Sequence, residues 1–196
     1  MLSRMIALLI GTLALASLRG QFAALPDPMA FWPLEQRLWF LAGFFTILTN
    51  LGVAGLMFAV ARGWRMPGLV AAGMVVSVVM VGVVYHLLLA RLWNPVGAAW
   101  WADQGLHSVV PVAVCIWWWG FADKRVGWRD LPLWLIWPAV YCGYALVRGY
   151  LTGFWPYPFL DGDSLGAVRL AMNIVGLLVA FAALGVGVVG VARLGR

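Results

Sequence analysis

Two threonines, one histidine and one aspartate in this sequence have the residue types and spacing that nucleophilic chemistry needs. A hydroxyl becomes a nucleophile when a base lies within hydrogen-bonding reach, and the base needs a third group to orient it. Thr46 or Thr49 could supply the hydroxyl, and His107 could take its proton. Asp103 stands four residues before His107, so on a helix both side chains share a face and the carboxylate can hold the imidazole tautomer.

The same residues also fit purely structural roles. A threonine within a helix commonly donates to the carbonyl one turn back, which for Thr46 is Ala42. Asp103 could pair with Arg91 or Arg148, and a single membrane histidine is often a packing donor. Residue types alone therefore favour neither of two interpretations, a catalytic site or a plug of hydrogen-bonded side chains that only tightens the helix bundle.

Further polar side chains could assist a reaction. Candidates for stabilising an oxyanion are Asn50, Asn173 and His86. Candidates for binding a substrate are Tyr144, Arg148 and Arg169. The sequence has no Gly-rich phosphate loop and no zinc-type Cys/His spacing, and its cysteines, Cys115 and Cys142, lie in apolar segments as small buried residues. We expect no metal and no organic cofactor.

The composition identifies the environment in which these residues act. Of 196 residues, 64% are hydrophobic and only 10% are charged, and the mean hydropathy is +0.94. A soluble domain carries roughly 25% charged residues, so this chain has too few charges to coat a water-facing globule. The formal charge of +6 comes from cations near the ends of apolar segments. We therefore expect membrane lipids, and not nucleic acid, as partners.

Six apolar segments are each long enough to cross a bilayer. They cover residues 6–23, 38–61, 68–92, 98–121, 131–151 and 165–192. The sequence thus predicts an all-α, polytopic six-helix bundle with short loops, forming a single transmembrane domain over residues 1–196. The charge at Arg19 argues against a cleaved signal peptide, so the first segment is expected to be a retained helix. The 23 glycines predict close helix contacts, with Gly185, Gly187 and Gly190 on the last helix.

Positive charges predict the orientation of the bundle. One side has eight Lys or Arg residues: Arg4, Arg62, Arg65, Lys124, Arg125, Arg129, Arg193 and Arg196. The other side has five: Arg19, Arg37, Arg91, Arg148 and Arg169. Both termini are therefore expected in the cytoplasm, and the Arg-, Ala-, Gly- and Val-rich composition points to a bacterial cytoplasmic membrane.

Polar side chains concentrate in the outer half of the predicted bundle. At about 1.5 Å per residue, Thr46 would lie about 12 Å below the outer start of its helix, and His86 about 9 Å below the outer end of its own. Five of the six helices contribute polar groups to this slab. Because unpaired polar groups are expensive in hydrocarbon, these side chains should turn inward, as a plug or as a site.

Three segments resemble signatures of the androgen-induced-protein-like family of membrane proteins. They are Phe44–Leu51, with its Phe-x-Thr pattern, Gly105–Pro111, with Gly-x-His-Ser-x-x-Pro, and Trp155–Asp161, with Tyr-Pro-Phe-Leu-acid. Order, spacing and helix count agree along nearly the whole chain. The bacterial branch of the family is the most similar.

The resemblance implies an intramembrane threonine hydrolase. Animal members hydrolyse fatty acid esters of hydroxy fatty acids, and their threonine and histidine fall on Thr46 and His107. The first motif is one residue longer here, so Thr49 competes with Thr46. Asp103 stands where animal members have asparagine, so its role rests on spacing alone.

The leading hypothesis is a lipid-ester hydrolase whose site opens into the outer half of the bilayer. Two other classes stay open. One is a haem-binding redox protein with His86 and His107 as axial ligands. The other is a non-enzymatic lipid-binding or transport protein, in which the polar slab only holds a headgroup.

Overall fold

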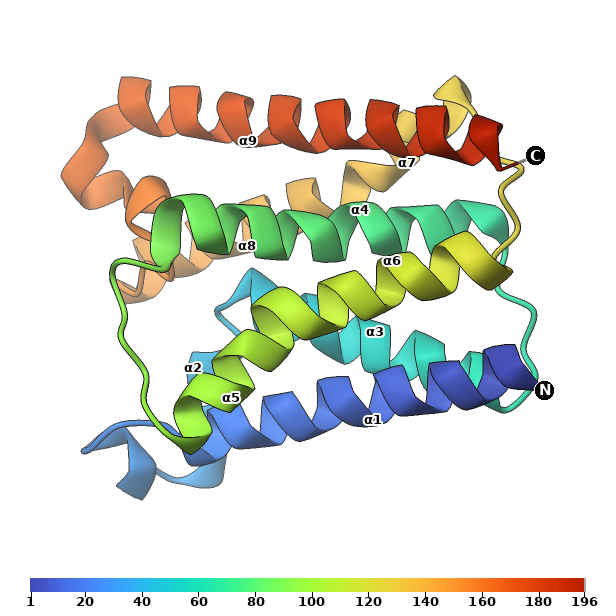
Figure 1. Ribbon diagram of the computed structural model, residues 1–196. Coiled ribbons are helices and arrows are strands. Elements are labelled where there is room, and N and C mark those ends of the chain that lie inside the picture. Colours follow the sequence, from blue (N-terminus) through green and yellow to red (C-terminus); the bar gives the residue numbers. More distant parts are fainter. Residues whose placement is uncertain (196) are drawn as a thin grey trace. The chain divides into compact units, whose positions relative to one another are not determined.

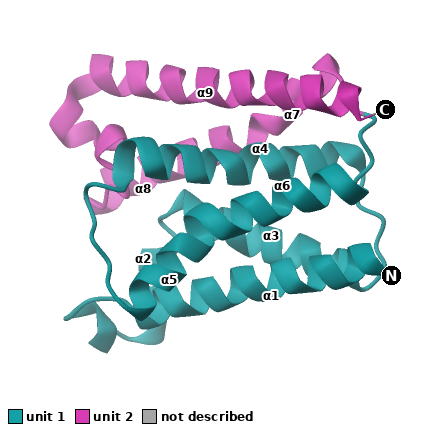
Figure 2. Cartoon of the chain, viewed as in Figure 1, with its two compact units in different colours: residues 1–125 teal, residues 126–196 magenta. Residues whose placement is uncertain are grey.

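The computed structural model describes residues 1–195, and every regular element within them is helical (Figure 1). This confirms the all-α prediction. The chain divides into two compact units, Met1–Arg125 and Val126–Arg196 (Figure 2). The single transmembrane domain over residues 1–196 stays a prediction.

The first unit is built from six α-helices and three short helical turns. The helices are α1 (Leu2–Ala23), α2 (Leu34–Leu41), α3 (Phe45–Ala61), α4 (Gly68–Val84), α5 (Ala98–Gln104) and α6 (Val110–Phe121). The turns are the 3-10 turn η1 (Met29–Phe31) and two π-helical turns, η2 (Tyr85–Leu89) and η3 (Gly105–Val109). The turn η2 extends α4, and η3 joins α5 to α6. Helix α1 packs against α3, α5 and α6, while α4 packs against α3 and α6 (Figure 1).

The second unit has one broken helix and one long helix, α9, which is kinked at Gly166, where φ is 72°. Its elements are η4 (Trp128–Asp130), α7 (Leu131–Trp134), α8 (Ile136–Thr152), η5 (Pro158–Leu160) and α9 (Gly162–Leu194). Helix α8 ends at Gly153, whose φ of 70° is accessible to glycine at little cost. The Asp161 carboxylate caps α9 by accepting from the N–H groups of Asp163 and Ser164. Helices α8 and α9 pack together.

Four helical stretches are long and apolar enough to cross a membrane. They are Leu2–Ala23, Gly68–Leu89, Trp128–Thr152 and Gly162–Leu194. A fifth is added if the bent pair α2 and α3 counts as one span. These stretches are those of an integral membrane protein. The predicted span over residues 98–121 is helical but is not among them, because Asp103, Gln104 and His107 make its first half polar.

The prediction of one continuous helix over residues 38–61 is wrong. Helix α2 ends at Leu41, α3 begins at Phe45, and the two axes differ by 96°. Glycine is about 1 kcal/mol less favourable in a helix than alanine, so Gly43 weakens the connection. The last turn of α2 then tightens, with N–H of Gly43 donating to the Phe40 carbonyl, and Phe44 adopts an extended conformation. Apolar periodicity alone does not distinguish a broken helix from a continuous one.

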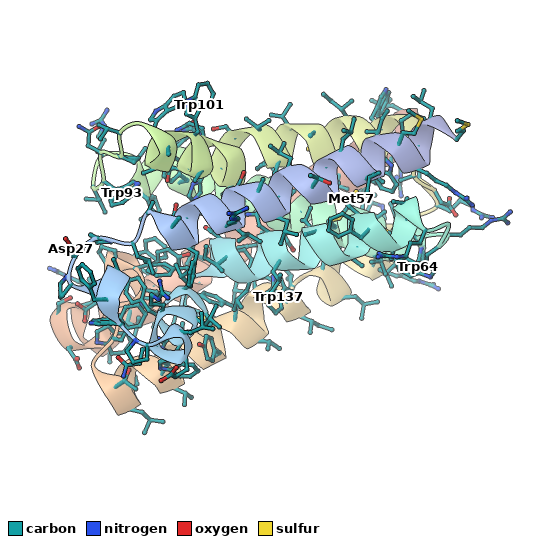
Figure 3. All side chains as sticks on the ribbon, turned by 90° about the horizontal axis from the view of Figure 1, so that it is seen from below. Asp27, Met57, Trp64, Trp93, Trp101 and Trp137 are labelled. Carbon is teal, nitrogen blue, oxygen red and sulfur yellow. The ribbon has the colours of Figure 1, made fainter. Side chains whose placement is uncertain are left out.

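This break moves Thr46 relative to its predicted position. Thr46 is the second residue of α3 and not a residue about 12 Å along a helix, as a uniform rise would give. Its N–H is therefore one of the first-turn groups that lack an acceptor within the helix. One face of α3 beyond it is buried, with Met57 fully enclosed, whereas Trp101 of α5 projects outward (Figure 3).

Small residues let the helices of the first unit approach closely, as the glycine content predicted. A Cβ atom added at Gly20 of α1 would lie 2.8 Å from the Cβ of Ala102 in α5. One added at Gly82 of α4 would lie 2.8 Å from the carbonyl oxygen of His107. On α9 the expectation holds in part, because Gly185 approaches Leu131 while its two glycine neighbours on the helix, at 187 and 190, face open space.

We expect Gly20→Ala to destabilise the protein and Gly52→Ala not to. An alanine gains about 1 kcal/mol of helix propensity, but at Gly20 the new methyl group overpacks the contact with Ala102, which costs about 1–3 kcal/mol. At Gly52 nothing lies within 4 Å of the added atom. Thermal unfolding of both variants in detergent measures the difference. Equal melting temperatures would contradict the close α1–α5 contact.

Candidate functional site

A buried carboxylate is the centre of the polar cluster in the first unit. Asp103 of α5 is only 2% exposed. The Tyr85 hydroxyl donates to its Oδ2, and the Gln104 amide donates to the same oxygen at 3.4 Å. The Nδ1 atom of His107 lies 3.3 Å from Oδ1. The four-residue spacing of Asp103 and His107 therefore produces the contact that the sequence predicts, and Arg91 is not a partner of Asp103 within residues 1–125.

The hydrogen bonds of His107 determine its tautomer. Its Nδ1 lies 2.9 Å from the backbone carbonyl oxygen of Asp103, and a carbonyl oxygen only accepts. Nδ1 must therefore carry the proton, so Nε2 of the neutral ring has a free lone pair. The Tyr85 ring stacks on the imidazole, with centroids 3.9 Å apart and planes at 15°. Asp103 thus orients the Nδ1 edge of the His107 ring, and the stacked Tyr85 ring orients its plane.

A second chain of hydrogen bonds runs from this carboxylate to the surface. Since Gln104 donates its amide N–H to Asp103, its Oε1 faces Ser108, whose hydroxyl donates at 2.8 Å. The Ser108 oxygen is then left to accept from Nε2 of His86 at 3.0 Å. All donors in the chain therefore point toward Asp103. This direction excludes Ser108 as a nucleophile activated by His86, because the serine proton points away from that imidazole.

Local sequence explains the turn that carries His107. Pro111, near the start of α6, has no N–H to donate to the carbonyl four residues back, which is that of His107. The ladder of hydrogen bonds is interrupted there, and η3 is wound as a π-helical turn, a feature frequent at functional sites. The carbonyl of His107 faces Gly82 of α4, where a larger residue would collide with it. Gly105 at the start of η3 likewise leaves room for the side chain of Ser17 in α1.

Asn50 connects α3 to this turn. The residue has no exposed surface, and its Nδ2 donates to the carbonyl oxygens of Thr46 at 2.9 Å and Leu106 at 3.4 Å. Its amide is thus a brace between the nucleophile candidate and the residue before His107. Both hydrogen bonds of the Asn50 amide nitrogen go to backbone carbonyls, and the role of Asn50 as an oxyanion donor stays a prediction. Its Oδ1 is buried and accepts no hydrogen bond from the described residues.

The two candidate threonines are both buried in α3. Thr46 is 8% exposed and Thr49 is 5% exposed. The back-bond from the Thr46 hydroxyl to Ala42 does not form, because the helix does not extend back to Ala42. Within residues 1–195 no hydrogen bond joins the Thr46 hydroxyl to any group, His107 included. The hydroxyl is therefore available for another partner.

The remaining site candidates lie in the second unit. Arg148 is buried, donates to the Tyr144 hydroxyl at 2.9 Å and lies 4.6 Å from the ring centre of Phe154. Asn173 donates to the Phe159 carbonyl at 2.9 Å and so braces a loop, and its role as an oxyanion donor stays a prediction. Arg169 is exposed. Binding of a substrate by Tyr144, Arg148 and Arg169 stays a prediction.

Sequence reasoning missed three members of the cluster. Gln104 and Ser108 had a detectable signal, since they stand four residues apart on the helix of Asp103 and His107. Tyr85 had only its position beside His86, and its contact with Asp103 joins two separate helices. No periodicity identifies such a contact.

The geometry also bears on metal and haem chemistry. In the part of the chain that the structure describes, no three His, Cys, Asp or Glu side chains are grouped to hold a metal ion. A bis-histidine haem site needs two imidazoles aimed at one iron. Instead, His107 packs face-on and His86 edge-on against the same Tyr85 ring. This arrangement favours a hydrogen-bonded centre over a haem site.

We expect Asn50→Ala to lower the free energy of unfolding by about 1–3 kcal/mol, because it leaves the carbonyl of Leu106 without its donor from α3. Amide hydrogen exchange of residues 105–109 should accelerate. The matched control is Ser77→Ala, which removes a buried hydroxyl bonded only to the Gly73 carbonyl of its own helix and should cost less. Equal effects of both variants would argue against a brace between α3 and η3.

Comparisons of the chain with protein-family models, with curated proteins and with solved structures find no match. The resemblance of Phe44–Leu51, Gly105–Pro111 and Trp155–Asp161 to the androgen-induced-protein-like family therefore stays a prediction. The function has to be argued from the cluster around Asp103 and His107.

Proposed function

We propose that the protein is an integral membrane hydrolase of lipid carboxylic esters, with Thr46 as the nucleophile and His107 as the general base. One observation carries the proposal: a buried carboxylate and a backbone carbonyl fix the proton of His107 on Nδ1, which leaves Nε2 able to take another. A carboxylate–imidazole pair of this kind is the basic half of a catalytic triad. Asn50 holds the turn with His107 beside the first turn of α3.

The proposed reaction has two stages. The Thr46 oxygen attacks the ester carbonyl carbon while its proton moves to Nε2 of His107, and that proton then passes to the departing alcohol. Water attacks the acyl-threonine with His107 again as base, which releases the carboxylic acid and restores the Thr46 hydroxyl. In the free protein Thr46 and His107 are not bonded, and catalytic hydrogen bonds often tighten only with substrate present.

The position of Thr46 in the first turn of α3 supports this mechanism. The N–H groups of Thr46 and Ile47 have no acceptor within the helix, and the positive end of the helix dipole lies there. Such groups can stabilise the negative oxygen of a tetrahedral intermediate. They are alternatives to the amides of Asn50 and Asn173 and the imidazole of His86, each of which uses a nitrogen in another hydrogen bond.

The substrate class follows from the apolar setting and the family resemblance. A site inside a bundle of apolar helices favours esters of long acyl chains, and the resemblance points to fatty acid esters of hydroxy fatty acids. A lipid-binding or transport protein is the competing class. Bound lipid without turnover in the wild-type protein would favour that class over the hydrolase.

We expect Thr46→Ala and His107→Ala each to lower kcat for such an ester by about 10³-fold or more, since each removes a group that acts as part of one unit. Product release by purified protein, measured by mass spectrometry, tests this. A fluorophosphonate probe should modify the wild type on Thr46 and leave Thr46→Ala unlabelled. The matched control is Thr152→Ala, whose hydroxyl bonds the Arg148 carbonyl one turn back. Labelling of Thr49 would move the nucleophile, and full activity of both variants would overturn the mechanism.

We further propose six crossings with both termini in the cytoplasm of a bacterium, which requires α2–α3 and residues 98–121 to span. A green fluorescent protein fused to either terminus should then fluoresce, and alkaline phosphatase fused there should be inactive. A phosphatase inserted after Pro28 should be active, because that loop would lie outside. Termini on opposite sides would show an odd number of crossings and contradict the six-helix topology.

A further inference from the structure

We infer that Tyr85 is a positioning residue for the Asp103–His107 pair, because it holds both members at once. Its hydroxyl bonds the carboxylate and its ring stacks on the imidazole. The catalytic consequence rests on the proposed hydrolase, whereas the effect on the state of His107 does not. Tyr85 comes from η2, while Asp103 and His107 come from the α5–η3 segment.

The hydroxyl of Tyr85 limits the rotation of the Asp103 carboxylate. It donates to Oδ2, so Oδ1 is left facing Nδ1 of His107. The Gln104 amide donates to the same Oδ2 but at 3.4 Å, and it is the end of a chain that reaches the exposed His86. Tyr85 is itself only 6% exposed. Water therefore does not readily replace it as the donor to this oxygen.

The ring of Tyr85 limits the imidazole in a different direction. Hydrogen bonds from Nδ1 fix one edge of His107, but the ring could still turn about that edge. Stacking at 3.9 Å with planes 15° apart fixes the plane of the imidazole, and with it the direction of Nε2. When His107 takes a proton, the face of the phenol ring also attracts the new positive charge. The ring and the hydroxyl of Tyr85 thus both help to orient Nε2 of His107, the nitrogen that accepts a proton.

A simple packing role for Tyr85 makes a different prediction. If only the volume of the side chain mattered, Tyr85→Phe would preserve every property of His107, since the stacked ring remains. If the hydroxyl positions Asp103, the same variant frees the carboxylate to rotate, and the Nδ1–H tautomer of His107 loses part of its stabilisation. Tyr85→Leu removes both the hydrogen bond and the stacking and should have the larger effect.

The test is nitrogen NMR of full-length protein with labelled histidine, recorded in detergent at alkaline pH. The sequence has only two histidines, so a His86→Gln variant assigns both. We expect wild-type His107 to be protonated on Nδ1 alone, Tyr85→Phe to mix both tautomers, and Tyr85→Leu to mix them further. Tyr150→Phe is the control, because it also removes one phenol hydroxyl while Tyr150 is exposed and its ring packs on Trp155, and it should leave the signals unchanged.

Kinetics separate this inference from the proposed function. Tyr85→Phe should lower kcat by about 10-fold with KM unchanged, a fraction of what a general base contributes. If Tyr85→Phe alters the His107 tautomer but neither the wild type nor any variant hydrolyses the ester, the positioning role stands and the hydrolase is rejected. Unchanged His107 signals in Tyr85→Phe would overturn the positioning role. If that variant does not fold, 4-fluorophenylalanine at position 85 keeps the stacked ring and lacks the hydroxyl donor, and unchanged signals there would overturn the positioning role equally.

Discussion

The polar architecture of the first unit depends on keeping one carboxylate inside an apolar bundle. Asp103 is almost fully buried, and a buried carboxylate without donors would destabilise the fold by several kcal/mol. Donors from η2, α5 and η3 therefore converge on it, through Tyr85, Gln104 and His107. The fold needs these donors for its stability, and one of the same hydrogen bonds also keeps the proton of the His107 imidazole on Nδ1. Structure and potential chemistry thus share the same hydrogen bonds.

These donors meet only because the helices can approach closely. Gly20 admits Ala102, Gly105 admits the Ser17 side chain, and Gly82 admits the carbonyl of His107. Each contact places backbone against side chain or backbone, where larger residues would force the helices apart. The proline at position 111 adds a break in the hydrogen-bond ladder at the point where His107 stands. The polar cluster is therefore held by small residues and one proline that carry no chemistry themselves.

The bend between α2 and α3 shows how a local weakness becomes a functional feature. Gly43 lowers the helical preference of the connection, and Phe44 turns extended. As a result α3 starts one residue before Thr46 and presents first-turn N–H groups beside a buried hydroxyl. In a continuous helix the same threonine would have bonded the carbonyl of Ala42. The bend, and not the residue type, makes the hydroxyl available.

The sequence by itself determined the helical class, the membrane setting and the i, i+4 pairing of Asp103 with His107. Each follows from composition or from the fixed repeat of a helix, which is local information. Only the tertiary structure decided that Asn50 braces the backbone, that Tyr85 joins the cluster and that α3 begins at Phe45. The first two are contacts between separate helices, set by how closely small residues let the backbones pack. The third is a balance between helix continuation and packing at Gly43, which local apolar periodicity does not encode.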